Sequence, residues 1–190
     1  MCIRDRVESL VGLIPAGGGC KEMLWRWLQT PEGKENSEHA SMKVFDLIGY
    51  AITATSPNEA MPNQFFLEKD KVVINRDRQL STAIDLLNTI EGGYKKPSQP
   101  KFNLGGSAVR DKMFEKLEAL YNENKILDHG LEVGKQIAFV LSGGNTNIDN
   151  ELSEDDLYNL ELEAFMRLIQ MPKTQERIKH TLETGKPLVN

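Results

Sequence analysis

Apolar residues recur at every third or fourth position along most of the chain, which is the spacing of one face of an α-helix. In the N-terminal half this spacing predicts a helix that begins at Gly19 or Cys20, and two more over residues 39–52 and 78–90. Four further helices are predicted over residues 107–124, 128–141, 153–170 and 172–184. The pattern Ser56-Pro57-Asn58-Glu59 adds a short capped helix that ends before Pro62. The expected fold class is mainly α.

Strand character is confined to one stretch, residues 65–74. Its aromatic and β-branched residues are split by a turn-like segment, residues 68–71, and predict a short hairpin or one extended segment. Residues 30–38 combine proline, glycine and charge, and predict a solvated loop between two helices. The chain should therefore contain at most one short strand or hairpin.

A segment rich in proline and glycine, residues 94–106 (YKKPSQPKFNLGG), is interpreted as a linker. It would separate residues 7–93 from a C-terminal helical cluster over residues 107–190. Residues 1–6 (MCIRDR) lack the apolar core and cleavage site of a signal peptide. We interpret them as a non-native leader, with a native N-terminal arm as the alternative.

Charge and cysteine usage exclude several classes of protein. The net charge is −5 and no run of Lys or Arg occurs, which argues against nucleic acid as a partner. No apolar stretch reaches the roughly 18 to 20 residues that a membrane span needs. Cys2 and Cys20 lack the spacing of a disulfide framework or a metal site, so we expect no metal and a cytoplasmic location.

Three consecutive glycines, Gly17 to Gly19, stand at the predicted entrance to the first helix. Backbone N–H groups exposed at such a place attract an anion or a polarised oxygen. The common phosphate-binding fingerprint needs Lys and a hydroxyl after its second glycine, whereas Gly17 is followed by more glycine. The dinucleotide fingerprint G-x-G-x-x-G also fails, so a nucleotide site is not indicated.

The segment that contains these glycines resembles the active-site loop of the crotonase (enoyl-CoA hydratase) family. The residues that carry the resemblance are Glu8, Gly12, Ile14, Pro15 and Gly17 to Gly19. The resemblance implies the helical C-terminal part of a crotonase-like α/β fold, and hydration of a 2-enoyl-CoA. It implies that Glu8 is one of two carboxylates that handle water and the α-proton. It assigns to Ala16, where the family often has glycine, a backbone N–H donated to that water.

The family's other carboxylate, and the two backbone donors that hold the thioester oxygen, lie upstream of this loop. The chain alone is therefore expected to be inactive, and to expose apolar helix faces that the β-rich part would cover. Residues 17–22 (GGGCKE) also resemble that upstream motif, with Glu22 as its carboxylate. The preceding G-L-I-P and the inserted Lys21 favour the later loop instead.

The rest of the chain resembles the end of large bacterial fused enzymes in which two dehydrogenase domains precede a hydratase domain. The matching segments are residues 74–78 (INRDR), 91–94 (EGGY), 139–144 (FVLSGG), 172–177 (PKTQER) and 184–187 (TGKP). This implies an acyl-CoA thioester as substrate, no cofactor in this chain, NAD in the parent's dehydrogenase domains, and leaves a homo-oligomer of the parent open. The competing class is a non-catalytic helical binding or oligomerisation module.

Other reactive side chains have structural interpretations. Cys20 would stand at a helix N-terminus, where thiol pKa values fall, but no histidine partner is identifiable. His39, His129 and His180 are each isolated among polar neighbours, which predicts surface residues rather than bases. On the third C-terminal helix, Leu157, Leu160, Ala164, Phe165 and Leu168 are predicted to form the apolar face, with Glu161 among the charged residues outside it.

Overall fold

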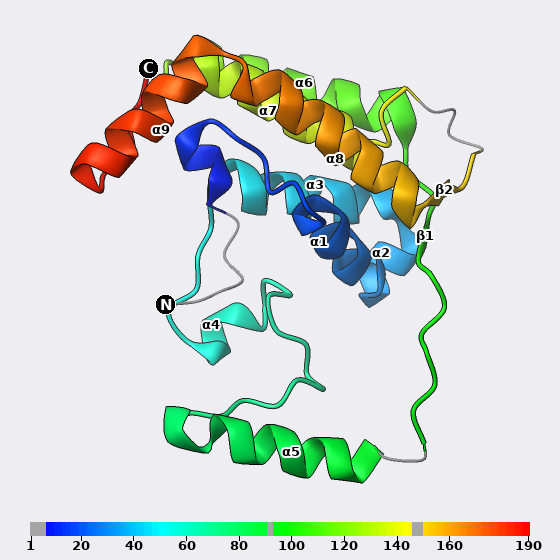
Figure 1. Ribbon diagram of the computed structural model, residues 1–190. Coiled ribbons are helices and arrows are strands. Elements are labelled where there is room, and N and C mark those ends of the chain that lie inside the picture. The colour runs from blue at the N-terminus through cyan, green and yellow to red at the C-terminus, as the bar shows by residue number, and fades with distance from the viewer. Residues whose placement is uncertain (1–6, 91–92, 146–149) are drawn as a thin grey trace.

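A computed structural model describes residues 7–90, 93–145 and 150–190, so the predicted leader, residues 1–6, lies outside the described residues. The described chain is mainly helical, as predicted (Figure 1). Its helices are α1 (Gly19–Leu28), α2 (Pro31–Glu35), α3 (Ser37–Gly49), α4 (Pro57–Ala60), α5 (Gln79–Ile90), α6 (Gly106–Asn122), α7 (Asp128–Leu141), α8 (Glu154–Ile169) and α9 (Pro172–Thr184). Two 3₁₀ turns, η1 (Glu8–Val11) and η2 (Arg76–Arg78), and two short strands, β1 (Lys101–Phe102) and β2 (Leu152–Ser153), complete it.

The helix predictions that depended on local signals are confirmed. Helix α1 begins at Gly19, and α9 has the predicted bounds. The side chain of Ser56 accepts a hydrogen bond from the Glu59 N–H and so caps α4. Ser153 caps α8 with a reciprocal bond to Asp156, the full capping box.

Two predictions of local structure are wrong. Residues 65–74 form no hairpin, because among the described residues no strand pairs with them and Phe65, 1% exposed, is buried in the helical core. The alternative of one unpaired extended segment stays a prediction. The strands lie at β1 and β2, which pair antiparallel with Lys101 opposite Ser153. The predicted loop over residues 30–38 contains α2, because Thr30 caps a turn that has proline at its first position.

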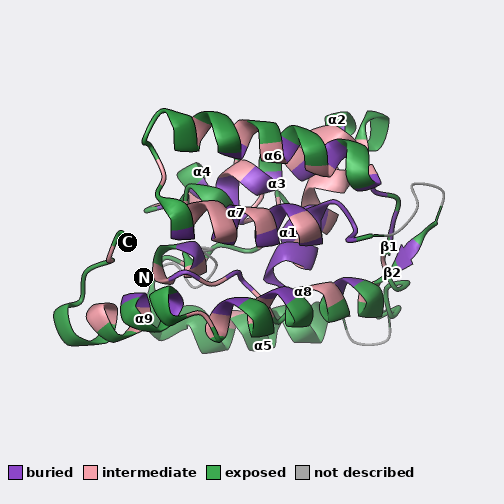
Figure 2. Cartoon of the chain, turned by 90° about the horizontal axis from the view of Figure 1, so that it is seen from above, coloured by how far each residue is buried: buried purple, intermediate pink, exposed green. Residues whose placement is uncertain are grey.

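Helix α7 is the centre of the core and packs against α1, α3, α6 and α8. In Figure 2 α7 lies between α6 and α8. The approach to α6 is close, since a Cβ on Gly134 would stand 2.4 Å from a methyl carbon of Leu117. Helices from both sides of residues 94–106 thus share this core, and the division into residues 7–93 and 107–190 stays a prediction.

Helix α5 lies apart from the other helices in Figure 1, and none of its described residues is buried. Leu80 is 73% exposed and Leu87 is 66% exposed, on a stripe that also holds Ile84 and Ile90. This confirms the expectation that the chain exposes apolar helix faces. Within the described part of the chain, no helix has both the length and the apolar character that crossing a bilayer requires.

Candidate functional site

The loop that precedes α1 begins with Glu8, the first residue of η1. The Glu8 side chain is half-buried, and its Oε2 atom is buried with no hydrogen-bond donor among the described residues. The next residue anchors the turn, since Ser9 Oγ donates to the carbonyl of Ile48 on α3 at 2.8 Å. Glu8 therefore combines a fixed backbone with a carboxylate oxygen that has lost water without gaining a donor.

Gly12 ends this turn in the left-handed conformation, with φ of +79°. A Cβ at this position would stand 2.8 Å from His129 Nε2 and 3.1 Å from Thr174 Oγ1. Glycine is thus required twice, for its backbone angle and for the close approach of α7 and α9.

Ala16, the predicted donor to water, lies on the same loop as Glu8. Its backbone N–H donates to the carbonyl of Ile14 at 2.8 Å, closing a three-residue turn. A water molecule bound by the Ala16 N–H would have to replace the Ile14 carbonyl as its acceptor. The predicted roles of Glu8 and Ala16 stay predictions, because nothing in the described structure stands in for water or substrate.

The glycine-rich entrance to α1 already holds an anion, and it belongs to the protein. The Glu161 carboxylate on α8 accepts hydrogen bonds from the backbone N–H of Gly18 at 2.6 Å and of Lys21 at 2.7 Å. Glu161 is 0% exposed, so its placement on a solvated face is wrong. Burial raises the pKa of the Glu161 carboxyl, and the N–H donors of Lys21 and Gly18 oppose that rise.

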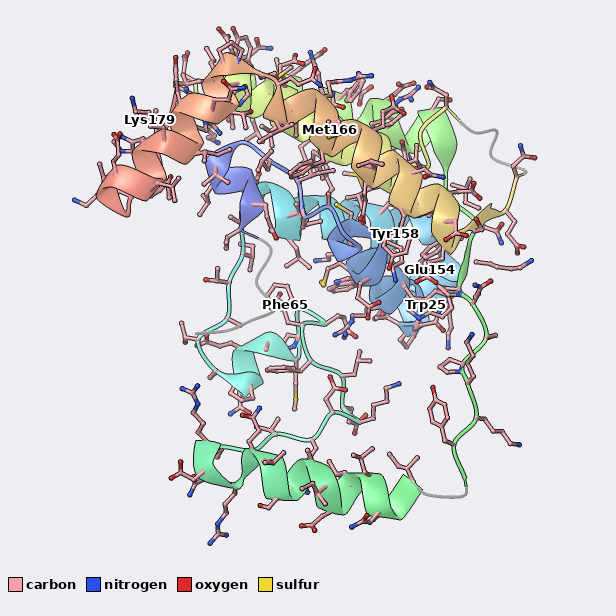
Figure 3. All side chains as sticks on the ribbon, viewed as in Figure 1. Trp25, Phe65, Glu154, Tyr158, Met166 and Lys179 are labelled. Atoms are coloured by element: carbon pink, nitrogen blue, oxygen red, sulfur yellow. The ribbon has the colours of Figure 1, made fainter. Side chains whose placement is uncertain are left out.

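Charged partners from α8 surround the first turn of α1. Lys21 is buried and its Nζ donates to Glu154 Oε1 at 2.5 Å, and it also lies 5.2 Å from the ring centre of Tyr158. Figure 3 shows Glu154 and Tyr158 on the part of α8 that runs over α1. Glu22, the alternative carboxylate, accepts from Arg26 Nε at 2.9 Å, so its charge is paired within α1.

A buried histidine contacts the same loop from the opposite side. His129 on α7 is 3% exposed and its Nε2 lies 2.8 Å from Thr174 Oγ1 on α9, so its predicted surface position is wrong. Burial lowers the pKa of His129, and the positive charges of Arg177 and Lys173 lower it further. His39 and His180 are half-buried, and Cys20 is buried in α1, in line with its structural interpretation.

An apolar cavity of about 230 Å³ lies beside η1, where Ser9 and Leu10 form part of its wall. The remaining wall comes from α3, α6, α7 and α9, the turn before α7, and the C-terminal residues Pro187 to Val189. Its charged lining residues include Arg177 and Lys125. Among the described residues, no group of three or more His, Cys, Asp or Glu could hold a metal ion.

Comparison with known proteins gives one informative relative. The chain is 33% identical over 185 residues to a probable 3-hydroxyacyl-CoA dehydrogenase of Bacillus subtilis (strain 168). The match covers 97% of this chain but 23% of that protein, so the chain spans less than a quarter of the relative's length. No protein-family model and no solved structure matches the chain. The relative's name agrees with the dehydrogenase part of the resemblance and does not mention a hydratase.

Proposed function

We propose that this chain supplies Glu8, and the N–H of Ala16, to a site that hydrates 2-enoyl-CoA within a longer protein of fatty-acid β-oxidation. The longer protein would also oxidise 3-hydroxyacyl-CoA with NAD, as the name of the relative suggests. The observation that carries the proposal is the buried Glu8 Oε2 atom, which no described residue serves as a donor. The crotonase-like spacing of Glu8, Gly12 and Pro15 supports the same reaction.

A buried carboxylate oxygen without a donor costs about 1 to 3 kcal/mol, or more when charged. A water molecule activated for addition would supply the missing hydrogen bond, and the carboxylate could accept its proton as a general base. Rigid anchoring of the turn through Ser9 keeps the carboxylate ready for that water. The hydrogen bond that Glu8 Oε2 loses on folding would thus be regained when water binds beside the substrate.

The chain supplies only part of such a site. The second carboxylate and the donors to the thioester oxygen would come from the longer protein, and one such donor is worth about 3 to 4 kcal/mol of transition-state stabilisation. The 190-residue chain alone should therefore be inactive. The proposal includes residues 7–93 as the site-bearing unit, residues 94–106 as a linker and residues 107–190 as a helical cluster, and it includes a cytoplasmic location.

The test uses the longer protein that contains this chain and separates its two activities. Glu8→Gln should lower kcat for 2-enoyl-CoA hydration by about 10²- to 10⁴-fold, the usual contribution of a general base. Oxidation of 3-hydroxyacyl-CoA should stay at the level of the unmodified protein. Glu22→Gln is the matched control, because the Glu22 carboxylate is paired with Arg26. The E22Q protein should hydrate 2-enoyl-CoA at the normal rate. Hydration by the E8Q protein at an unchanged rate would falsify the proposal.

The exposed stripe of α5 favours a second candidate function, a non-catalytic helical binding module. Leu80 and Leu87 could bury their apolar area against a partner. The same assay distinguishes the two candidate functions. If the chain is a non-catalytic module, E8Q should change no activity of the longer protein.

A further inference from the structure

A chain of hydrogen bonds links α7 and α9 to the turn that carries Glu8. Thr174 Oγ1 donates to the carbonyl of Gly12 at 3.1 Å. A hydroxyl has one proton, so the 2.8 Å contact between Thr174 Oγ1 and His129 Nε2 must have the histidine as donor. The order of donors is therefore His129, Thr174 and then the Gly12 carbonyl.

The last acceptor belongs to the same hydrogen-bonded turn as Glu8. The N–H of Gly12 donates to the carbonyl of Ser9 at 3.1 Å, and the N–H of Leu13 donates to the carbonyl of Glu8 at 3.0 Å. The Gly12 carbonyl and the Leu13 N–H belong to one planar peptide unit, so a shift of that unit would weaken the Leu13 bond to the Glu8 carbonyl. Ser9 holds one end of this turn to α3, and Thr174 holds the other end to α9.

Solvent is excluded from the whole connection. Thr174 is 0% exposed and Arg177, whose side chain lies along Gly12, is buried. Arg177 is held in place by the C-terminal residue, since its Nε donates to Asn190 Oδ1 at 2.8 Å. Hydrogen bonds in such a dry setting are stronger and resist small displacements.

We infer that Thr174 and His129 are positioning residues that fix the Glu8 carboxylate through the Gly12 carbonyl. This inference rests on the proposed function, because it assigns a task to α7 and α9 in the same hydration site. Neither side chain touches the substrate. Their effect is on where the Glu8 backbone sits relative to the reacting water, and a misplacement of about 1 Å can cost about 10²-fold in rate.

The experiment compares Thr174→Val and Thr174→Ser in the longer protein. Valine keeps the shape of threonine and removes the donor, so kcat for 2-enoyl-CoA hydration should fall about 10- to 100-fold while KM changes little. Serine keeps the hydroxyl and should restore kcat to within about 3-fold. Oxidation of 3-hydroxyacyl-CoA should be the same in both, because the proposal assigns that reaction to other domains of the longer protein. Matching urea-denaturation midpoints of the two variants would show that the helical part is folded.

A second readout does not depend on catalysis. Hydrogen exchange at the Leu13 N–H, which donates to the Glu8 carbonyl, should be faster in T174V than in the unmodified protein and unchanged in T174S. If T174V is not folded, His129→Phe removes the donor to Thr174 instead. Thr174 then keeps its own bond to the Gly12 carbonyl, so kcat and protection should fall in the same direction by a smaller factor.

The outcomes separate the two proposals. If E8Q hydrates at the normal rate, the proposed function fails, whatever Thr174 does. If E8Q is inactive while T174V keeps both normal kcat and normal Leu13 protection, the positioning role is wrong and the hydratase site stands. A T174V protein with raised KM and unchanged kcat also overturns the positioning role.

Discussion

Glu161 on α8 accepts a hydrogen bond of 2.7 Å from the backbone N–H of Lys21 on α1, across 140 residues of sequence. The same carboxylate accepts from Gly18, so it serves as the N-terminal cap that α1 lacks in its own sequence. The N–H groups at the N-terminus of α1, which could bind an anion, instead form a tertiary contact with α8.

Replacing this carboxylate should destabilise the protein. In Glu161→Gln an amide NH₂ would face one of the two backbone N–H donors, so we expect a loss of about 1 to 3 kcal/mol in the free energy of unfolding. Urea denaturation followed by circular dichroism measures it. Glu163→Gln is the control, since Glu163 is exposed and forms an exposed ion pair with Arg167, and its cost should stay below about 1 kcal/mol. Equal midpoints for the two variants would contradict the capping role.

Two of the glycines at positive φ in the loop, Gly12 and Gly17, offer a matched pair. Gly17 has φ of +94° with nothing within 4 Å of a new Cβ, whereas a Cβ on Gly12 would meet His129 Nε2 at 2.8 Å. Gly17→Ala should therefore cost only the backbone strain, about 1 to 2 kcal/mol. Gly12→Ala should cost about 1 to 3 kcal/mol more through overpacking. Denaturation midpoints of the two variants provide the test, and equal costs would show that the contact at Gly12 relaxes freely.

Protonation of His129 gives the fold a pH dependence of defined sign. Its pKa is lowered in the folded state by burial and by Arg177 and Lys173, with Glu132 and Glu176 opposing. As the pH falls below about 6.5, the unfolded chain binds a proton that the folded chain does not, so the free energy of unfolding falls. The loss stops below the folded pKa.

His129→Gln isolates this effect, because glutamine keeps a donor for Thr174 and does not titrate. The difference in unfolding free energy between the unmodified protein and H129Q should shrink as the pH is lowered from about 7.5 to about 5.5. Glu161, whose pKa is raised, acts in the opposite sense at lower pH and cancels in this comparison. Parallel pH profiles for the two proteins would rule out His129 as the source.

The apolar stripe of α5 should govern association rather than stability. Leu80→Glu and Leu87→Glu change exposed side chains, so the free energy of unfolding should move by no more than about 0.5 kcal/mol. Both changes should reduce self-association of the 190-residue chain, which sedimentation velocity measures. Identical sedimentation with and without the substitutions would show that the stripe is not a contact surface.

Sequence patterns predicted those parts of the fold that neighbouring residues decide. The cap at Ser56 and the proline at the start of α9 are local signals, and both helices form where predicted. The strand prediction failed because β-pairing depends on a distant partner, here Leu152 opposite Phe102. Periodicity within residues 65–74 contains no information about such a partner.

The two buried polar residues were missed although a signal for each exists. Glu161 stands four residues after Leu157 and three before Ala164, which places it on the buried face of α8. His129 stands four residues before Val133 on the buried face of α7. A titratable residue in register with an apolar stripe indicates that it has a specific buried partner. The sequence pattern does not identify that partner, because Gly18 and Thr174 are distant along the chain from Glu161 and His129.

Both tryptophans of the chain lie on α1, the helix that follows the Glu8 loop. The Trp25 ring meets Phe102 of β1 edge-on at 5.9 Å between ring centres, and Trp27 lies 6.5 Å from the His39 ring on α3. Intrinsic fluorescence therefore senses one junction rather than the whole molecule. If tryptophan emission changes before the helical circular-dichroism signal is lost, α1 has separated from its neighbours before the helices unfold. Intrinsic fluorescence thus reports on α1, the helix that follows the Glu8 loop.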